Sequence, residues 1–93
     1  MAYKVGIELE VKLKIGKNLN DLIRAIRTAG ISIRDERSTH NGTTGNGDGW
    51  KVVFDGTNSR DGRRIWEFVS DPIKGSKKIE KMVTEICPIL SQY

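Results

Sequence analysis

Four carboxylates occupy positions from which alternating side chains would reach one face of a sheet. Glu8 and Glu10 stand two residues apart in GIELEV, Asp55 ends WKVVFD, and Glu67 lies inside RIWEFVS. Side chains two apart in a strand point the same way, about 7 Å from each other. Carboxylate oxygens are the ligands that Mg²⁺ and Mn²⁺ prefer, often beside substrate phosphates. The four residues are therefore candidate ligands for a divalent cation that would support phosphoryl chemistry.

The same pattern also fits a solvated strand face without any chemistry. Lys12 and Lys14 continue the outward positions after the two glutamates, and Lys51 lies on another predicted strand. Opposite charges pair across neighbouring strands and contribute little when they are exposed. A cation site and a set of paired surface charges are thus both open interpretations. The single histidine, His40, lies in a glycine-rich segment, where solvent exposure is more typical than catalysis.

The first third of the chain predicts a strand, a helix and a second strand. Apolar and polar residues alternate over Val5–Ile15, which predicts a half-buried strand with the two glutamates outward. Asn18 is a predicted N-cap for a helix over Leu19–Ala29, and Gly30 is typical of the position just after a helix. A short strand is predicted over Ile31–Asp35.

The rest of the chain predicts a loop, two strands and a last helix. The segment Arg37–Gly49 is dense in glycine, asparagine and threonine, which is typical of a loop. It lacks the Gly-Lys-Ser/Thr ending of a phosphate-binding loop. Strands are predicted over Trp50–Asp55 and Arg64–Val69, with the large aromatic side chains inward. Ser76 is a predicted N-cap for the last helix, and Pro88 should kink or end that helix.

The predicted order of elements is β-α-β-β-β-α within one domain, residues 1–93. We expect an α+β fold with a mainly antiparallel sheet. Each helix carries one apolar stripe, so both would cover the same apolar face of the sheet. The face that bears the carboxylates would then stay open.

Charge and composition limit the classes of partner that the chain could bind. The chain has 16 Lys and Arg against 12 Asp and Glu, a net charge of +4, which permits contact with nucleic acid or an acidic protein. The single cysteine, Cys87, excludes an internal disulfide and fits a cytoplasm, bacterial or of a host cell. No apolar run approaches the ~20 residues that span a bilayer, so no membrane association is expected. Six basic residues are candidates for partner binding, with solvated surface as the alternative: Arg60, Arg63, Arg64, Lys74, Lys77 and Lys78.

Three motifs, kept in order along the chain, resemble the opening segment of the amidoligase family. These are carboxylate–amine ligases of phages, plasmids and microbes, related in fold to glutamine synthetase and glutamate–cysteine ligase. Their pattern is Gly-Ile/Val-Glu-x-Glu, then Trp-x-Val-x-x-Asp-Gly-Ser/Thr, then Glu-x-Val-Ser-x-Pro before a glycine and a helix. The matching residues are Gly6, Ile7, Glu8, Glu10, Trp50, Val52, Asp55, Gly56, Thr57, Glu67, Val69, Ser70, Pro72 and Gly75. Asp71 stands where the family commonly has a proline.

The resemblance implies an ATP- and Mg²⁺-dependent ligase face, with Glu8, Glu10 and Glu67 as metal ligands and Asp55 orienting the site. The chain matches only the first half of the family, so we expect no catalytic residues and no independent ligase activity, because an open half-site does not exclude water.

We expect instead a small non-enzymatic binding module that needs no cofactor. It would be phage or mobile-element encoded and would inhibit a host protein or ribonucleoprotein, as anti-CRISPR proteins do. One alternative is an Mg·ATP-binding subunit of a ligase, completed by another chain or by a second copy in a homodimer. A second alternative is a nucleic-acid-binding protein.

Overall fold

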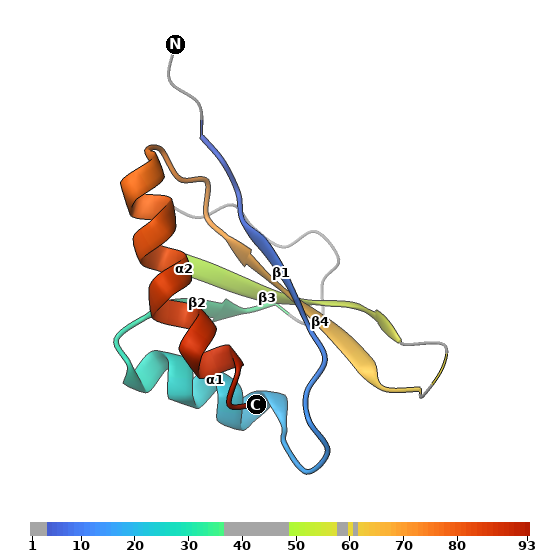
Figure 1. Cartoon of the computed structure of the whole chain (residues 1–93). Coiled ribbons are helices and arrows are strands. Elements are labelled where there is room, and N and C mark those ends of the chain that lie inside the picture. Colours follow the sequence, from blue (N-terminus) through green and yellow to red (C-terminus); the bar gives the residue numbers. More distant parts are fainter. Residues whose placement is uncertain (1–3, 37–48, 58–59, 61) are drawn as a thin grey trace.

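The computed structural model describes residues 4–36, 49–57, 60 and 62–93, apart from the side chains of residues 55 and 57. It has the α+β class expected from the sequence, with two helices and one four-stranded sheet (Figure 1). The elements are β1 (Glu8–Val11), α1 (Leu19–Thr28), β2 (Ser32–Asp35), β3 (Gly49–Thr57), β4 (Arg64–Ser70) and α2 (Ser76–Leu90).

The sheet is mixed, with the strand order β1-β4-β3-β2. β4 lies between β1 and β3 and runs antiparallel to both, whereas β2 pairs with β3 in parallel. The two edges of the sheet are therefore β1 and β2. The antiparallel β3–β4 ladder has an irregular register between Phe54 and Gly56.

Local capping chemistry explains where α1 begins and ends. The side chain of Asn18 accepts a hydrogen bond from the N–H of Asp21 at 2.9 Å, as an N-cap residue does. Gly30 follows the C-cap with φ of +85°, a conformation that favours glycine. Both predicted ends of this helix are confirmed to within one residue. The predicted apolar stripe is buried: Leu19, Leu22, Ile23 and Ile26.

The core lies between the two helices and one face of the sheet. Figure 1 shows α1 and α2 on the same side of the strands. Trp50, Trp66 and Phe68 are at most 7% exposed and face the helices, as strand parity predicts. Met82 and Ile86 are the buried residues of α2. The single cysteine, Cys87, packs half-buried against this core.

The first strand is shorter than the alternation suggested. β1 pairs with β4 over Glu8–Val11 only, and Val5 forms an isolated bridge with Ile73. Ile15 was expected inward, but it is 90% exposed, because the chain turns at residues 15 and 16 on its way to α1. Half-buried and exposed side chains still alternate from residue 7 to Lys14.

The last helix also differs from its prediction at both ends. Ser76 was expected as the N-cap but is the first helical residue, and Gly75 is the N-cap without a side-chain hydrogen bond. Pro88 does not end α2, which continues for two residues beyond it. A proline this close to a helix end removes one hydrogen bond, and the next turn still closes with the N–H of Ser91 donating to the carbonyl of Cys87 at 3.0 Å.

Some predictions fall on residues outside this description. The loop over residues 37–48, with His40, is among them, and so is the side chain of Asp55. Gly49, which was assigned to that loop, is the first residue of β3. In the described part of the chain, neither helix has the length and apolar character needed to cross a membrane.

Candidate functional site

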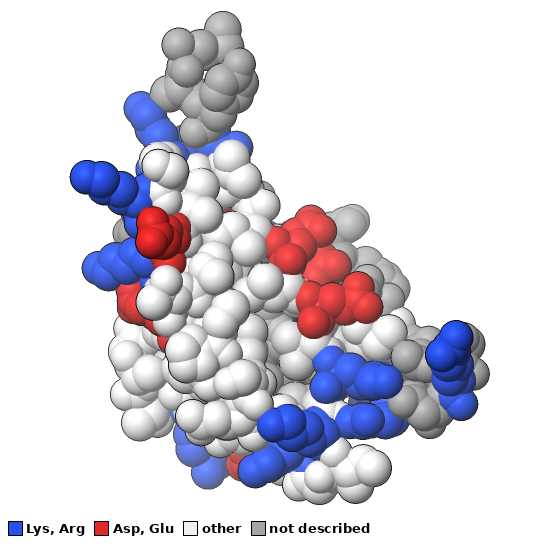
Figure 2. Space-filling model, viewed as in Figure 1, with Lys and Arg blue, Asp and Glu red and all other residues white. Residues whose placement is uncertain are grey.

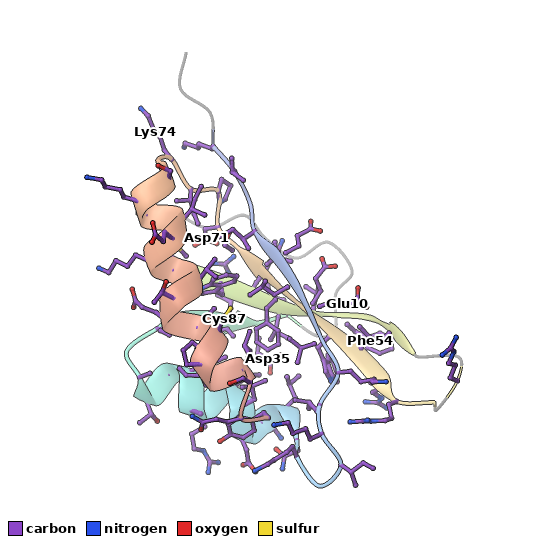
Figure 3. All side chains as sticks on the ribbon, in the orientation of Figure 1. Glu10, Asp35, Phe54, Asp71, Lys74 and Cys87 are labelled. Atoms are coloured by element: carbon purple, nitrogen blue, oxygen red, sulfur yellow. The ribbon has the colours of Figure 1, made fainter. Side chains whose placement is uncertain are left out.

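The sheet face that points away from both helices, which we call the outer face, collects charged residues from all four strands. Strand parity and register place its side chains in rows across the sheet. One row joins Glu8, Val69, Lys51 and Arg34. The next row joins Glu10, Glu67 and Val53. Figure 3 shows Glu10 pointing away from α2, in agreement with this assignment.

The outer face brings together three of the four carboxylates singled out in the sequence. Glu10 and Glu67 are register partners on β1 and β4, and Glu8 lies two residues further along β1. Glu8 and Glu10 are exposed, whereas Glu67 is half-buried. Asp55 belongs to β3, but its side chain lies outside the described residues.

This carboxylate group concentrates negative charge. Like charges directly opposite each other on neighbouring strands repel. Among the described residues, no ion pair or hydrogen bond engages the side chain of Glu8 or Glu10. The described residues also contain no group of three or more His, Cys, Asp or Glu side chains placed to hold a metal ion. A metal-binding role for Glu8, Glu10 and Glu67 stays a prediction.

Part of the outer face is buried and holds a polar network that the sequence did not indicate. Asp71, just after β4, is 5% exposed. Its Oδ1 accepts from Nη2 of Arg34 at 3.0 Å, and its Oδ2 accepts from the N–H of Gly49 at 3.1 Å. Arg34 also reaches Glu36, with 3.5 Å between Nε and Oε2. The buried carboxylate is thus satisfied by a charged donor and a backbone donor, as burial requires.

The electrostatics of Arg34 follow from this network. Its hydrogen bond to Asp71 raises the pKa of the guanidinium above the ordinary arginine value, against a smaller lowering by partial burial. The charges of Asp71 and Glu36 raise the pKa further. Arg34 therefore stays protonated at every accessible pH and links β2 to the end of β4 across β3.

The six basic candidates do not form a single surface. Arg63 and Arg64 line one cleft, and Lys77 and Lys78 line another. The second cleft, of about 580 Å³, also contains Lys81 and Glu85, so its positive charge is partly offset. The remaining two candidates, Arg60 and Lys74, are exposed and line neither cleft.

The cleft with the two arginines, which we call the basic cleft, lies between the β1–α1 connection and the beginning of β4. Its volume is about 700 Å³. Among the described residues, its lining contains four Lys or Arg, two Asn and no Asp or Glu, and Asp21 lies beside it in a hydrogen bond with the lining residue Asn18. Figure 2 shows basic side chains gathered at this lower end of the molecule, apart from the acidic group higher on the sheet. The lining residues are Leu13, Lys14, Ile15, Gly16, Lys17, Asn18, Leu19, Asn20, Arg63, Arg64 and Trp66.

Two lysines of the basic cleft are held by the C-terminal turn. Nζ of Lys14 donates to the carbonyl of Ser91 at 2.7 Å. Nζ of Lys17 lies 5.1 Å from the ring centroid of Tyr93, a cation–π distance. Neither lysine is among the six basic residues that were predicted to bind a partner. The available signal was the closeness of both lysines to the N-cap of α1, because a helix N-terminus adds positive potential.

Comparison of the chain with protein-family models, with curated proteins and with solved structures gives no match. The resemblance to the amidoligase family rests on the motifs alone and stays a prediction. In the chain's own geometry, the basic cleft and the carboxylate group of the outer face are surfaces of opposite charge.

Proposed function

We propose that the protein is a nucleic-acid-binding module that holds a phosphate backbone in the basic cleft. The observation that carries this proposal is the gathering of four basic side chains in one cleft, whose described lining residues include no Asp or Glu. Lys and Arg side chains bind phosphates and release the counterions condensed on the nucleic acid, which supplies most of the affinity in contacts that do not read sequence. The net charge of +4 favours the same partner.

The walls of the cleft favour contact with phosphates over contact with bases. Trp66 is the only aromatic side chain among its lining residues, and it is 7% exposed. Its ring makes a T-shaped contact with Phe54, with 5.5 Å between centroids, and its burial leaves little of the ring available as a stacking platform. Recognition through phosphates alone is independent of base sequence.

Binding of a fluorescein-labelled single-stranded RNA of about 20 nucleotides, followed by fluorescence anisotropy, tests the proposal. The double variant Arg63→Gln/Arg64→Gln should weaken binding at least about tenfold at low salt, because it removes half of the cleft's basic side chains. The matched control Lys74→Gln/Lys77→Gln removes the same charge outside the cleft and should change the affinity much less. Equal losses in the two variants would show that net charge, and not the cleft, is responsible.

The inhibitor role predicted from the sequence is one use of such a cleft. A small protein that covers the phosphate backbone of a host ribonucleoprotein keeps other nucleic acid from reaching it. Complexes of the tagged protein isolated from cells should then contain RNA and fall apart on RNase treatment. Complexes that persist after RNase treatment and after Arg63→Gln/Arg64→Gln would count against this use.

A second candidate function is supported by the register of the outer face. Glu10 lies opposite Glu67, with Glu8 on the same face, and Lys51 and Arg34 extend the row of Glu8. Such a face would bind Mg·ATP as part of a ligase-like site only with a metal ligand from outside the described residues, because these contain no group of three His, Cys, Asp or Glu side chains placed to hold a metal ion. Calorimetry with Mg·ATP should then show binding that Glu67→Gln abolishes. Absence of heat with Mg·ATP at millimolar concentration would exclude this candidate for the chain on its own.

A further inference from the structure

Along the edge of β1 that faces away from β4, the backbone groups of Glu8 and Glu10 have no partner among the described residues. The N–H of Ser70 in β4 donates to the carbonyl of Ile7 at 2.8 Å, so Ile7 directs its backbone groups toward β4. In an antiparallel pair this direction alternates, and the N–H and carbonyl of Glu8 and Glu10 therefore point away from β4. No described residue pairs with them there, because β1 is the last strand of the sheet. Such an edge is a template for another strand.

The charges along this edge are self-complementary. Glu8 and Glu10 precede Val11, and Lys12 and Lys14 follow it at the mirrored positions. Two copies paired antiparallel about Val11 would place Glu10 opposite the partner's Lys12, and Glu8 opposite the partner's Lys14.

The backbone geometry agrees with this register. Glu10 and Lys12 have the parity whose backbone groups face away from β4, so they would fall at hydrogen-bonded pairs, whereas the N–H of Lys14 already donates to the carbonyl of Tyr93. A shift by one pair in either direction brings Glu10 opposite the partner's Glu10, or Lys12 opposite the partner's Lys12. Only the register about Val11 joins opposite charges throughout.

The apolar side chains of β1 are also incompletely buried in a single copy. The side chains of Leu9, Val11 and Leu13 pack against the core but stay half-buried. In the register about Val11, Leu9 would lie beside the partner's Leu13. Pairing would therefore cover apolar surface that a single copy leaves in water.

We propose that β1 pairs with β1 of a second copy of this chain about a two-fold axis at Val11. The two four-stranded sheets would become one continuous sheet with an isologous interface. The pairing would also offset part of the repulsion between the carboxylates of Glu10 and Glu67, which are register partners within one copy. The partner's Lys12 would place a positive charge on the other side of Glu10.

The C-terminal turn limits the length of the new ladder. The N–H of Lys14 already donates to the carbonyl of Tyr93 at 2.6 Å. The inter-copy hydrogen bonds therefore centre on the two symmetric pairs of Glu10 with Lys12. Lys14 would contribute through its ammonium group, which would leave the carbonyl of Ser91 for the partner's Glu8.

Sedimentation equilibrium over a wide concentration range tests the proposal. The wild-type protein should form a dimer that dissociates on dilution. Glu10→Lys and Lys12→Glu should each weaken the dimer by about tenfold to a hundredfold, since each replaces two attractive cross-strand pairs by two repulsive ones. The double variant Glu10→Lys/Lys12→Glu restores opposite charges and should dimerise within about threefold of the wild type. Glu80→Lys, an equal charge change on the exposed face of α2, is the control.

The same variants distinguish an effect on dimerisation from an effect on the folding of the single chain. Glu10→Lys faces Glu67 within one copy, so its thermal unfolding as a monomer should not fall below that of the wild type. A protein that stays monomeric up to millimolar concentration would overturn the proposal. A dimer whose dissociation constant does not change in either single variant would also overturn the proposal. The same holds if the double variant does not recover the dimerisation of the wild type. Neither Glu10 nor Lys12 lines the basic cleft, so nucleic-acid binding is tested independently.

Discussion

Replacing Asp71 with alanine removes the acceptor of two hydrogen bonds that described residues donate at the end of β4. The N–H of Gly49, in buried surroundings, loses its partner, which costs about 1–3 kcal/mol. The hydrogen bond from Arg34 is charge-assisted, but the Arg34 side chain is 33% exposed, so we discount its loss to about 1 kcal/mol. Together these losses predict that the free energy of unfolding falls by about 2–4 kcal/mol.

Urea unfolding followed by the fluorescence of the buried Trp50 and Trp66 measures this loss. Asp71→Asn keeps an acceptor for one of the two donors and should cost less, about 1–2 kcal/mol. Glu36→Gln is the matched control, because Glu36 contacts the same arginine from 3.5 Å and should cost less than about 1 kcal/mol.

The result that would refute this account of Asp71 is a loss below about 0.5 kcal/mol in Asp71→Ala, the size expected of an ordinary surface substitution. Equal losses in Asp71→Ala and Glu36→Gln would also contradict it. Either result would mean that the buried N–H of Gly49 finds another acceptor when the carboxylate is removed.

Three further predictions concern the fold. Ile26→Ala should cost about 2–5 kcal/mol in urea unfolding, because Ile26 is fully buried, whereas Ile15→Ala, at a 90% exposed residue, should stay within about 0.5 kcal/mol of the wild type in dilute monomeric protein. Asn18→Ala should cost about 1 kcal/mol and lower the helical circular dichroism signal, because the N-cap bond to Asp21 is lost. The raised pKa of Arg34 predicts a contribution to stability that is fully present below the ordinary arginine pKa and lost only above it. Arg34→Met should therefore lower the free energy of unfolding equally at pH 6 and pH 9, whereas a loss confined to one of the two would contradict this.

The features that the sequence predicted well depend on neighbours along the chain. The limits of α1 follow from Asn18 and Gly30, which act on the turns next to them. The inward positions of Trp50, Trp66 and Phe68 follow from parity within single strands. Interactions of this kind depend on residues a few positions apart and not on which strands pair.

The features that the sequence did not predict depend on how distant segments meet. Asp71 gains its role from Arg34, 37 residues away, through the parallel pairing of β2 with β3 and the antiparallel pairing of β3 with β4. The basic cleft joins Lys14 and Lys17 to Arg63 and Arg64 only because the chain brings the β1–α1 connection beside the beginning of β4. No local pattern contains these pairings.

Pro88 was expected to kink or end the last helix, and the reason that α2 does not end there is different. A proline stops a helix in its interior because it removes a hydrogen bond and crowds the preceding turn. Pro88 lies in the last turn of α2, where the cost is smaller and the packing of Ile89 and Leu90 against the core favours continued helix. Tertiary contacts thus outweigh the local preference.

The salt dependence of RNA binding tests the central claim, that the basic cleft holds a phosphate backbone, most directly. With four basic side chains on phosphates, the logarithm of the association constant should fall with the logarithm of salt concentration with a slope of about −3. Arg63→Gln/Arg64→Gln should reduce the slope to about −1.5, whereas Lys74→Gln/Lys77→Gln should leave it near the wild-type value. A slope that is the same in all three proteins, or binding that does not respond to salt, would contradict the claim.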